Sequence, residues 1–171
     1  MAARTSTAAM TPAPGRPDVL IPAVGQCSGA ALRKAARRVS LIYDAVLAPA
    51  GLRSTQLSLL IHVARRGEPT LGELASHLEL DRSALPDNLR PMMRDGLIVV
   101  RPCEIDRRGR RVSLTEAGYA KLSEATALWS TAQQRFEAAL RADEALALSR
   151  ALDRITGDGF LAAFAEALVR P

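Results

Sequence analysis

The sequence predicts a mainly α-helical chain with one small β-hairpin, in which long helices flank a compact central unit. Apolar residues recur at the spacing of one helix face through most of the 171 residues. Between residues 97 and 114 the period of the apolar pattern changes from about 3.6 residues to two residues, which is typical of short strands. Apolar stripes near both ends are longer than one small domain can bury, and they predict the flanking helices.

The composition indicates a self-folding domain whose positive charge is concentrated in one segment. Hydrophobic residues make up 48% of the chain, which argues against disorder, and no apolar run is long enough to span a membrane. We therefore expect no membrane partner. The net charge is +5, and residues 82–111, with eight basic and four acidic residues, carry most of the excess.

Residues 1–25 are predicted to form a flexible arm because they show no helical periodicity and are rich in Ala and Pro. Within the arm, residues 19–21 are apolar and can dock on a partner subunit, although an idle segment fits them as well. The apolar core of a secretory signal peptide is missing, so we expect a cytoplasmic protein. The prolines of the arm are Pro12, Pro14, Pro17 and Pro22.

The first predicted helix has its apolar face from Leu32 onwards and ends at Pro49 and Gly51. Ser54 is expected to cap a second helix that ends at Gly67. This arrangement predicts two helices joined by a short turn.

Thr70 is expected to cap a short third helix, with Glu73 at the position of a capping box. A fourth helix starts at Asp81 or Ser83, and Gly96 follows it at the place of a left-handed C-cap. Short helices joined by tight turns suggest a helix-turn-helix.

Two short strands follow, at residues 97–100 and 111–114, and a polar turn at residues 106–109 joins them. Thr115 is expected to cap a long helix, and further helical segments run from residue 146 to residue 168, with a break at Gly157 and Gly159. Because such long amphipathic helices bury their stripes against each other or against a second copy of the chain, we predict a homodimer.

The sequence does not favour an enzyme or a metalloprotein. Cys27 and Cys103 are 76 positions apart, which fits neither a disulfide framework nor a paired-thiol metal site. The chain has no Gly-rich phosphate loop, no paired-His motif and no nucleophile with an evident base. We expect no catalytic residue, no metal and no cofactor.

Ordered motifs run through the central region of the chain. They are Leu71-Gly-Glu-Leu-Ala, Leu80-Asp-Arg-Ser-Ala-Leu, Asn88-Leu-Arg-Pro, Asp95-Gly-Leu-Ile and Asp106-Arg-Arg-Gly-Arg-Arg-Val-Ser-Leu-Thr-Glu-Ala-Gly118. In this order the motifs resemble the MarR family of winged-helix transcription regulators, and the likeness covers about residues 27 to 141.

The resemblance implies a winged helix-turn-helix flanked by N- and C-terminal dimerisation helices. The implied divisions are an arm at 1–25, a dimerisation helix and turn at 26–53, the DNA-binding domain at 54–114 and C-terminal dimerisation helices at 115–171. A protein of this kind is a homodimeric regulator of transcription, more often a repressor. It binds a pseudo-palindrome of double-stranded DNA with a recognition helix in the major groove and the hairpin wing on the backbone or in the minor groove.

The residues expected to contact DNA lie on the recognition helix and the wing. Arg82 and Ser83 stand at the start of the recognition helix, where free N–H groups favour a phosphate. Arg90 can reach a phosphate or a guanine edge. The wing arginines suit a narrow minor groove, and Asp106 is expected to orient them by a salt bridge to Arg108. These wing arginines are Arg107, Arg108 and Arg110.

Two recognition-helix residues depart from the family pattern. Pro86 and Asp87 stand where relatives have a small or hydroxyl residue followed by Arg. Pro86 is costly inside a helix and cheap in the first turn, so we predict that the helix starts late, near Ser83. Asp87 either selects a cytosine amino group or weakens DNA binding, and in the second case the chain acts as a regulator-like scaffold through protein–protein contacts.

The resemblance also implies two kinds of effector. A small aromatic or phenolic acid can bind between the dimer helices and the DNA-binding lobe, where Arg and Tyr side chains can bond its carboxylate. The residues that would line this site also suit purely structural positions. Cys27, just ahead of the first helix, resembles cysteines of relatives that sense peroxide, and an idle thiol is the alternative. The ligand candidates are Arg37, Arg38, Tyr43, His62 and Trp129.

Overall fold

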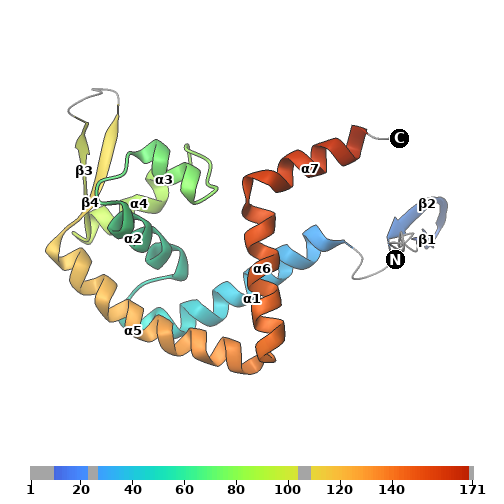
Figure 1. The fold of residues 1–171 in the computed structure, drawn as a ribbon, viewed down its shortest axis with the longest axis horizontal. Coiled ribbons are helices and arrows are strands. Elements are labelled where there is room, and N and C mark those ends of the chain that lie inside the picture. Colours follow the sequence, from blue (N-terminus) through green and yellow to red (C-terminus); the bar gives the residue numbers. More distant parts are fainter. Residues whose placement is uncertain (1–9, 23–26, 104–108, 170–171) are drawn as a thin grey trace. The chain divides into compact units, whose positions relative to one another are not determined.

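The computed structural model describes residues 10–22, 27–103 and 109–169, and within these ranges the chain is mainly helical with two small antiparallel hairpins (Figure 1). The central helices and the second hairpin confirm the predicted fold class. Two compact units divide the chain between Ala45 and Val46.

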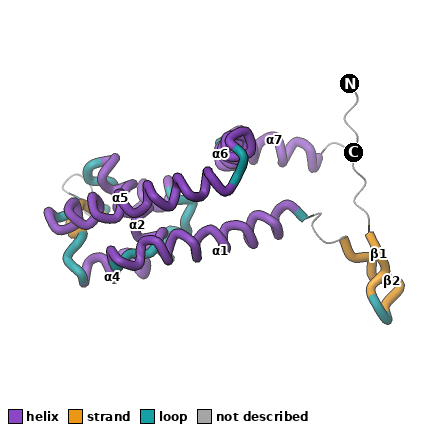
Figure 2. The backbone as a smooth tube through the Cα atoms, turned by 90° about the horizontal axis from the view of Figure 1, so that it is seen from below, coloured by secondary structure: helices purple, strands orange, loops and turns teal. Residues whose placement is uncertain are grey.

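The first unit contains an N-terminal hairpin that the sequence analysis did not predict. Strands β1 (Met10–Ala13) and β2 (Arg16–Pro22) pair antiparallel (Figure 2). Pro14 and Gly15 form the turn, and Gly15 has a φ of 72°, as the second central residue of a type II turn requires. The sequence pattern predicts no regular structure at residues 10–22, where Pro14-Gly15 initiates a turn. The flexibility of the arm stays a prediction.

Helix α1 (Ser28–Leu47) starts directly after Cys27, whose carbonyl accepts a hydrogen bond from Ala31 N at 3.0 Å. Leu47 is the only fully buried residue of this helix. Helix η1 (Ala48–Ala50) follows and ends at Gly51, which has a φ of 68°. The predicted helix end at this point is confirmed.

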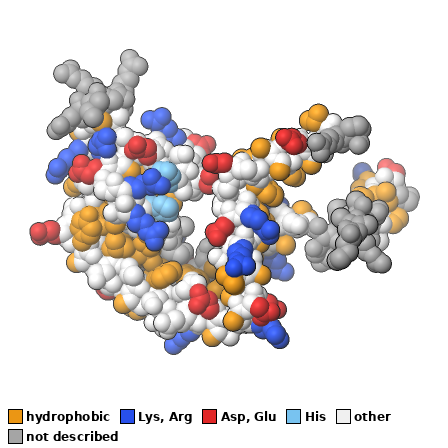
Figure 3. Space-filling view, in the orientation of Figure 1, with side chains coloured by type: hydrophobic (Ala, Val, Ile, Leu, Met, Phe, Trp, Pro, Cys, Tyr) orange, Lys and Arg blue, Asp and Glu red, His pale blue; other side chains and the backbone are white. Residues whose placement is uncertain are grey.

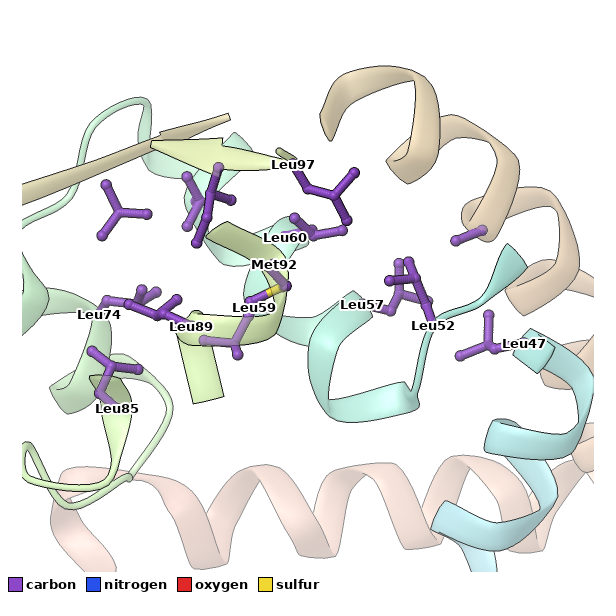
Figure 4. Packing of buried hydrophobic residues seen from close by; sticks show 14 of the residues in the cluster. Leu47, Leu52, Leu57, Leu59, Leu60, Leu74, Leu85, Leu89, Met92 and Leu97 are labelled. Carbon is purple, nitrogen blue, oxygen red and sulfur yellow. The ribbon is translucent and has the colours of Figure 1, made fainter. Parts of the chain in front are cut away.

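The second unit is built around one hydrophobic core (Figure 4). Helices α2 (Ser54–Arg66), α3 (Leu71–His77) and α4 (Leu85–Arg94) contribute their apolar faces, and strands β3 (Ile98–Pro102) and β4 (Arg110–Leu114) cover them. Helix α5 (Glu116–Ala139) adds Ala125. The largest fully buried side chains are Leu47, Leu60, Leu74, Leu85, Leu89, Met92, Val63 and Val112.

The helix starts in this unit follow the expected capping chemistry with one difference. Thr70 Oγ1 accepts from Glu73 N at 3.2 Å, and Glu73 Oε2 accepts from Thr70 N at 2.7 Å, which confirms the capping box of α3. Ser54, however, is the first residue of α2 rather than its cap. The preceding residue, Arg53, donates its N–H to Gln56 Oε1 at 2.8 Å, so a glutamine side chain satisfies the helix start.

Helix α4 starts late, as predicted. It begins at Leu85, so Pro86 lies in the first turn, where its missing N–H removes no helical hydrogen bond. A second proline, Pro91, lies inside the helix. Gly96 follows with a φ of 71°, which confirms the predicted left-handed helix end, and Leu97 N donates to Met92 O at 2.9 Å.

Strands β3 and β4 form the hairpin that the sequence predicts, with Val100 opposite Val112. The strand β4 is tied to the loop before α3: Thr70 and Arg111 form an antiparallel bridge, and Val112 N donates to Pro69 O at 2.9 Å. The base of the hairpin is therefore fixed against the helix-turn-helix. The tip, including Asp106, Arg107 and Arg108, lies outside the described residues.

Helix α5 is locked to the hairpin at its first turn. Thr115 Oγ1 accepts from Gly118 N at 3.0 Å and donates to Gly96 O at 2.7 Å, which confirms the predicted cap. Gly118 packs so closely that a Cβ there would lie 2.0 Å from Leu97 O. Only glycine fits at this contact.

Two further helices complete the chain. Helix α6 (Ala142–Thr156) has Gly157 as its C-cap, and α7 (Asp158–Val169) follows directly. The predicted break is confirmed at Gly157, whereas Gly159 lies inside α7. Neither helix buries a residue, although both carry large apolar side chains. None of the described helices combines the length and the hydropathy needed to cross a membrane.

Candidate nucleic-acid interface

The outer face of α4 is polar and exposed, whereas the inner face is part of the core. Leu85, Leu89 and Met92 point inward and are fully buried. Asp87 and Arg90 lie on the opposite side and are exposed. Basic side chains lie on the visible face of this lobe, around α2, α3 and the base of β3 and β4 (Figure 3). This arrangement leaves one side of α4 free to enter a groove.

The residues before α4 form a hydrogen-bonded turn rather than the first helical turn. Asp81 Oδ1 accepts from both the N–H and the hydroxyl of Ser83, each at 2.8 Å, and these bonds lower the pKa of Asp81. Ser83 is exposed, but its hydroxyl proton is engaged by Asp81. Arg82 is exposed and reaches toward α3: its guanidinium carbon would lie 3.8 Å from a Cβ at residue 72.

Asp87 is paired with Arg90 along the exposed face of α4. Arg90 Nη2 donates to Asp87 Oδ1 at 2.9 Å, and the two side chains are 78% and 74% exposed, respectively. At the end of the same helix, Arg94 Nε donates to Asp95 Oδ1 at 2.9 Å, which raises the pKa of Arg94. The carboxylate of Asp87 is thus bound to the cation one turn away.

The base of the wing has an arginine whose guanidinium is fixed by several partners. Arg111 Nη1 donates to Glu68 O at 2.6 Å, and a hydrogen bond to Cys103, followed by the charges of Cys103, Glu73 and Glu68, raises the pKa of Arg111. Cys103 is buried. Arg110, the first residue of β4, is exposed and open to a partner, as is Arg101 on β3.

The ligand candidates lie on three different helices. Arg37 and Arg38 are exposed on α1, where Tyr43 is half-buried. His62 is half-buried on α2, and its pKa is lowered by burial and then by Arg65, Arg66 and His77. Trp129 is exposed on α5. Their role as a ligand site stays a prediction.

Cys27 is a free, exposed thiol immediately before α1, and its redox role stays a prediction too. No three or more His, Cys, Asp or Glu side chains within the described ranges are grouped so as to hold a metal ion.

Three features of the lobe are not predicted from the sequence. The Asp87–Arg90 pair is visible in the sequence as opposite charges three positions apart, a spacing that brings side chains together on a helix. Pro91 was read only as part of a motif. The tight contact of Gly118 had no local sequence signal, because the atom that it approaches belongs to Leu97.

Comparison with known proteins identifies the family. The MarR family model matches residues 50–109. The crystal structure of the M. tuberculosis transcriptional regulator MosR in complex with DNA is 33% identical in sequence, with a TM-score of 0.63, over 75% of this chain and 97% of that chain. The chain belongs to the MarR family.

Other solved structures agree with this membership of the MarR family. The transcriptional repressor CouR, bound to a 23-mer DNA duplex, is 28% identical, with a TM-score of 0.73, over 78% of this chain and 95% of that chain. A mutant MarR from E. coli complexed with operator DNA shares the fold, with a TM-score of 0.69 at 24% identity over 74% of this chain and 91% of that chain. None of the curated proteins matches the chain.

Proposed function

We propose that the chain is a sequence-specific DNA-binding regulator of transcription that acts as a homodimeric repressor. The observation that carries the proposal is the exposed, charged outer face of α4 on a helix whose inner face is buried. A helix held in this way can enter the major groove, and the wing base beside it brings Arg110 toward the phosphate backbone. Membership of the MarR family and the DNA complexes of similar proteins support it.

In this proposal the side chains of the recognition helix and the wing bind different parts of the DNA. Arg82 and Arg110 neutralise phosphates, and Arg107 and Arg108 reach from the wing tip into a minor groove. Ser83 contacts a phosphate only after its N–H or hydroxyl is released from Asp81. Asp87 and Arg90 face the bases.

The exposed apolar faces of α6 and α7 support a homodimer. Many exposed large apolar side chains on neighbouring helices favour an interaction site, and a symmetric dimer covers the same patch on both copies. The Val19–Ile21 segment of β2 is also exposed and can dock on a partner subunit. The side chains on α6 and α7 that would be covered are Leu146, Leu148, Leu152, Ile155, Phe160, Leu161, Phe164, Leu168 and Val169.

Sedimentation velocity tests the dimer. Leu161→Glu combined with Phe164→Glu places charges on the proposed interface and is expected to convert a dimer into monomers. Tyr119→Glu, at an exposed position on α5, is the control and is expected to leave the dimer intact. A native chain that sediments as a monomer at micromolar concentration would refute the dimer.

Regulation of this repressor has two proposed forms. The first is a small aromatic or phenolic acid, which releases the DNA only if it binds the DNA-free state more tightly. Oxidation of the exposed Cys27 is the second form. If peroxide leaves Cys27 a free thiol by mass spectrometry and DNA affinity is unchanged, the second form is excluded.

Fluorescence anisotropy tests the main proposal. The native chain is titrated with DNA from upstream of its own gene and with a scrambled duplex at several salt concentrations. We expect specific binding tighter by a factor on the order of 10³ and a steep decline with salt. Equal weak binding to genomic DNA fragments and to the scrambled duplex would overturn the proposal.

The scaffold alternative, in which Pro86 and Asp87 prevent base reading, makes an opposite prediction. Pro86 in the first turn of α4 costs little, and Asp87 is neutralised by Arg90, so both residues are compatible with DNA. If Asp87→Arg creates DNA binding that the native chain lacks, the scaffold alternative is supported instead.

A further inference from the structure

The Asp87–Arg90 pair leaves hydrogen-bond donors and an acceptor exposed on the outer face of α4. Both side chains are more than 70% exposed, and an exposed ion pair of this kind adds little to stability. The buried residues of α4 lie on its other side and hold the helix without help from the pair. Its position on the outer face of the helix therefore calls for a role in recognition.

Local structure holds the two side chains in one arrangement. Asp87 is the third residue of α4, a position where the free N–H groups of the helix start favour a carboxylate. Arg90 is one turn further, and its Nη2 lies 2.9 Å from Asp87 Oδ1. The pair thus presents guanidinium donors next to a carboxylate acceptor. Because the two side chains already hold each other, they lose less conformational freedom on binding a ligand than two unpaired side chains would.

We infer that Asp87 and Arg90 act as one unit that reads a G·C base pair in the major groove, an inference that rests on the proposed function. The major-groove edge of G·C offers two acceptors on guanine, N7 and O6, beside one donor, cytosine N4. The pair offers the complement: donors from Arg90 and the second carboxylate oxygen of Asp87.

The same chemistry excludes the other main ligands of an arginine. At an A·T pair, the guanidinium meets the adenine amino donor and the carboxylate meets the thymine O4 acceptor, so like groups face each other. At a phosphate, the carboxylate of Asp87 would be brought against a second anion. A lone arginine binds phosphates readily, whereas the coupled pair favours a base.

Selection from a DNA library with randomised half-sites, followed by affinity measurement on single-base variants, tests the inference. The native chain is expected to prefer G·C at one position of each half-site by about tenfold or more over A·T. Asp87→Asn and Arg90→Lys are each expected to reduce this preference severalfold at that position alone. Arg90→Lys keeps the charge, so its affinity should decline with salt as steeply as that of the native chain.

A matched control is available on the same helix. Asp95 also pairs with an exposed arginine at 2.9 Å but lies at the helix end, so Asp95→Asn removes the same charge and is expected to leave the base preference unchanged. Circular dichroism of each variant verifies that it is folded.

The outcomes separate the inference from the function on which it rests. If the native chain selects no sequence, the proposed function fails and the inference fails with it. If the native chain selects a sequence but Asp87→Asn leaves every base preference unchanged, or only tightens binding to all duplexes equally, the inference alone is overturned. Relaxed preference at one G·C position in both Asp87→Asn and Arg90→Lys supports it.

Discussion

The DNA-binding lobe and the C-terminal helices are both strongly helical, yet they differ in where their apolar side chains lie. In the lobe, each of α2, α3 and α4 buries two or more apolar residues completely. In α6 and α7 no residue is buried, and Leu168 and Val169 are 73% and 83% exposed. Local sequence favours a helix, but most of the stability of a helix comes from packing its apolar face on a partner surface. The lobe supplies that surface from its own chain, and for α6 and α7 the proposed second copy of the chain would supply it.

The largest difference should appear when one leucine is truncated in each region. Leu74→Ala is expected to lower the free energy of unfolding by about 2–5 kcal/mol, because Leu74 is fully buried in the lobe. Leu161→Ala, in α7, should change it by no more than about 0.5 kcal/mol in protein dilute enough to be monomeric. Urea denaturation followed by circular dichroism measures both. Equal losses of unfolding free energy in the two variants would mean that Leu161 is packed as well as Leu74 is.

Glycines offer a second comparison of the two regions. Gly118→Ala in α5 is expected to cost about 1–3 kcal/mol, because the added Cβ would lie 2.0 Å from the backbone oxygen of Leu97. In α7, a Cβ at Gly159 meets nothing within 4 Å, so Gly159→Ala should stabilise the chain by up to about 1 kcal/mol through helix propensity. Thermal unfolding of the two variants tests this. A destabilised Gly159→Ala variant would show that α7 is not free on that side.

The same difference explains which parts of the molecule the sequence predicts well. The central helices, the Thr70 and Thr115 caps and the left-handed Gly96 all depend on residues close in sequence, and the structure confirms them. The N-terminal hairpin was missed because Pro14 and Gly15 were counted as markers of disorder rather than as a turn.

The candidate interface follows a similar division. The late start of α4 was predictable from Pro86, whose position in a helix is restricted. The pairing of Asp87 with Arg90 requires knowing where the helix starts, and the contact of Gly118 with Leu97 joins residues 21 positions apart. Contacts between elements are set by packing, so a pattern of single residues does not reveal them.

Acid should weaken the start of α3 through Glu73. Hydrogen bonds from the N–H and then the hydroxyl of Thr70 lower the pKa of Glu73 below the 4.5 of a free carboxyl. Because the folded pKa is depressed, the stabilisation is fully present above about pH 4.5 and is lost as the pH falls through the folded value. In Glu73→Gln this pH dependence should disappear.

Urea midpoints between pH 3 and 6 provide the test. The native midpoint should fall faster than that of Glu73→Gln below pH 4.5, and the two should run parallel above it. Glu166→Gln, on the exposed α7, is the control and should follow the native curve. A constant difference between native and Glu73→Gln at every pH would show that the carboxylate form has no special part in the cap.

The smallest expected effect concerns the turn between α3 and α4. Glu79 has a φ of 50°, the left-handed conformation that favours glycine, and it stands where α3 ends with Leu80 N bonded to Ala75 O at 3.0 Å. Glu79→Gly relieves this strain but increases the entropy of the unfolded chain, so we expect a net gain of only about 0.5 kcal/mol. Gly96→Ala provides the opposite change at the end of α4, where φ is 71°, and should cost about 1 kcal/mol. If Glu79→Gly instead lowers the thermal midpoint, the side chain of Glu79 contributes more to the lobe than its backbone conformation costs.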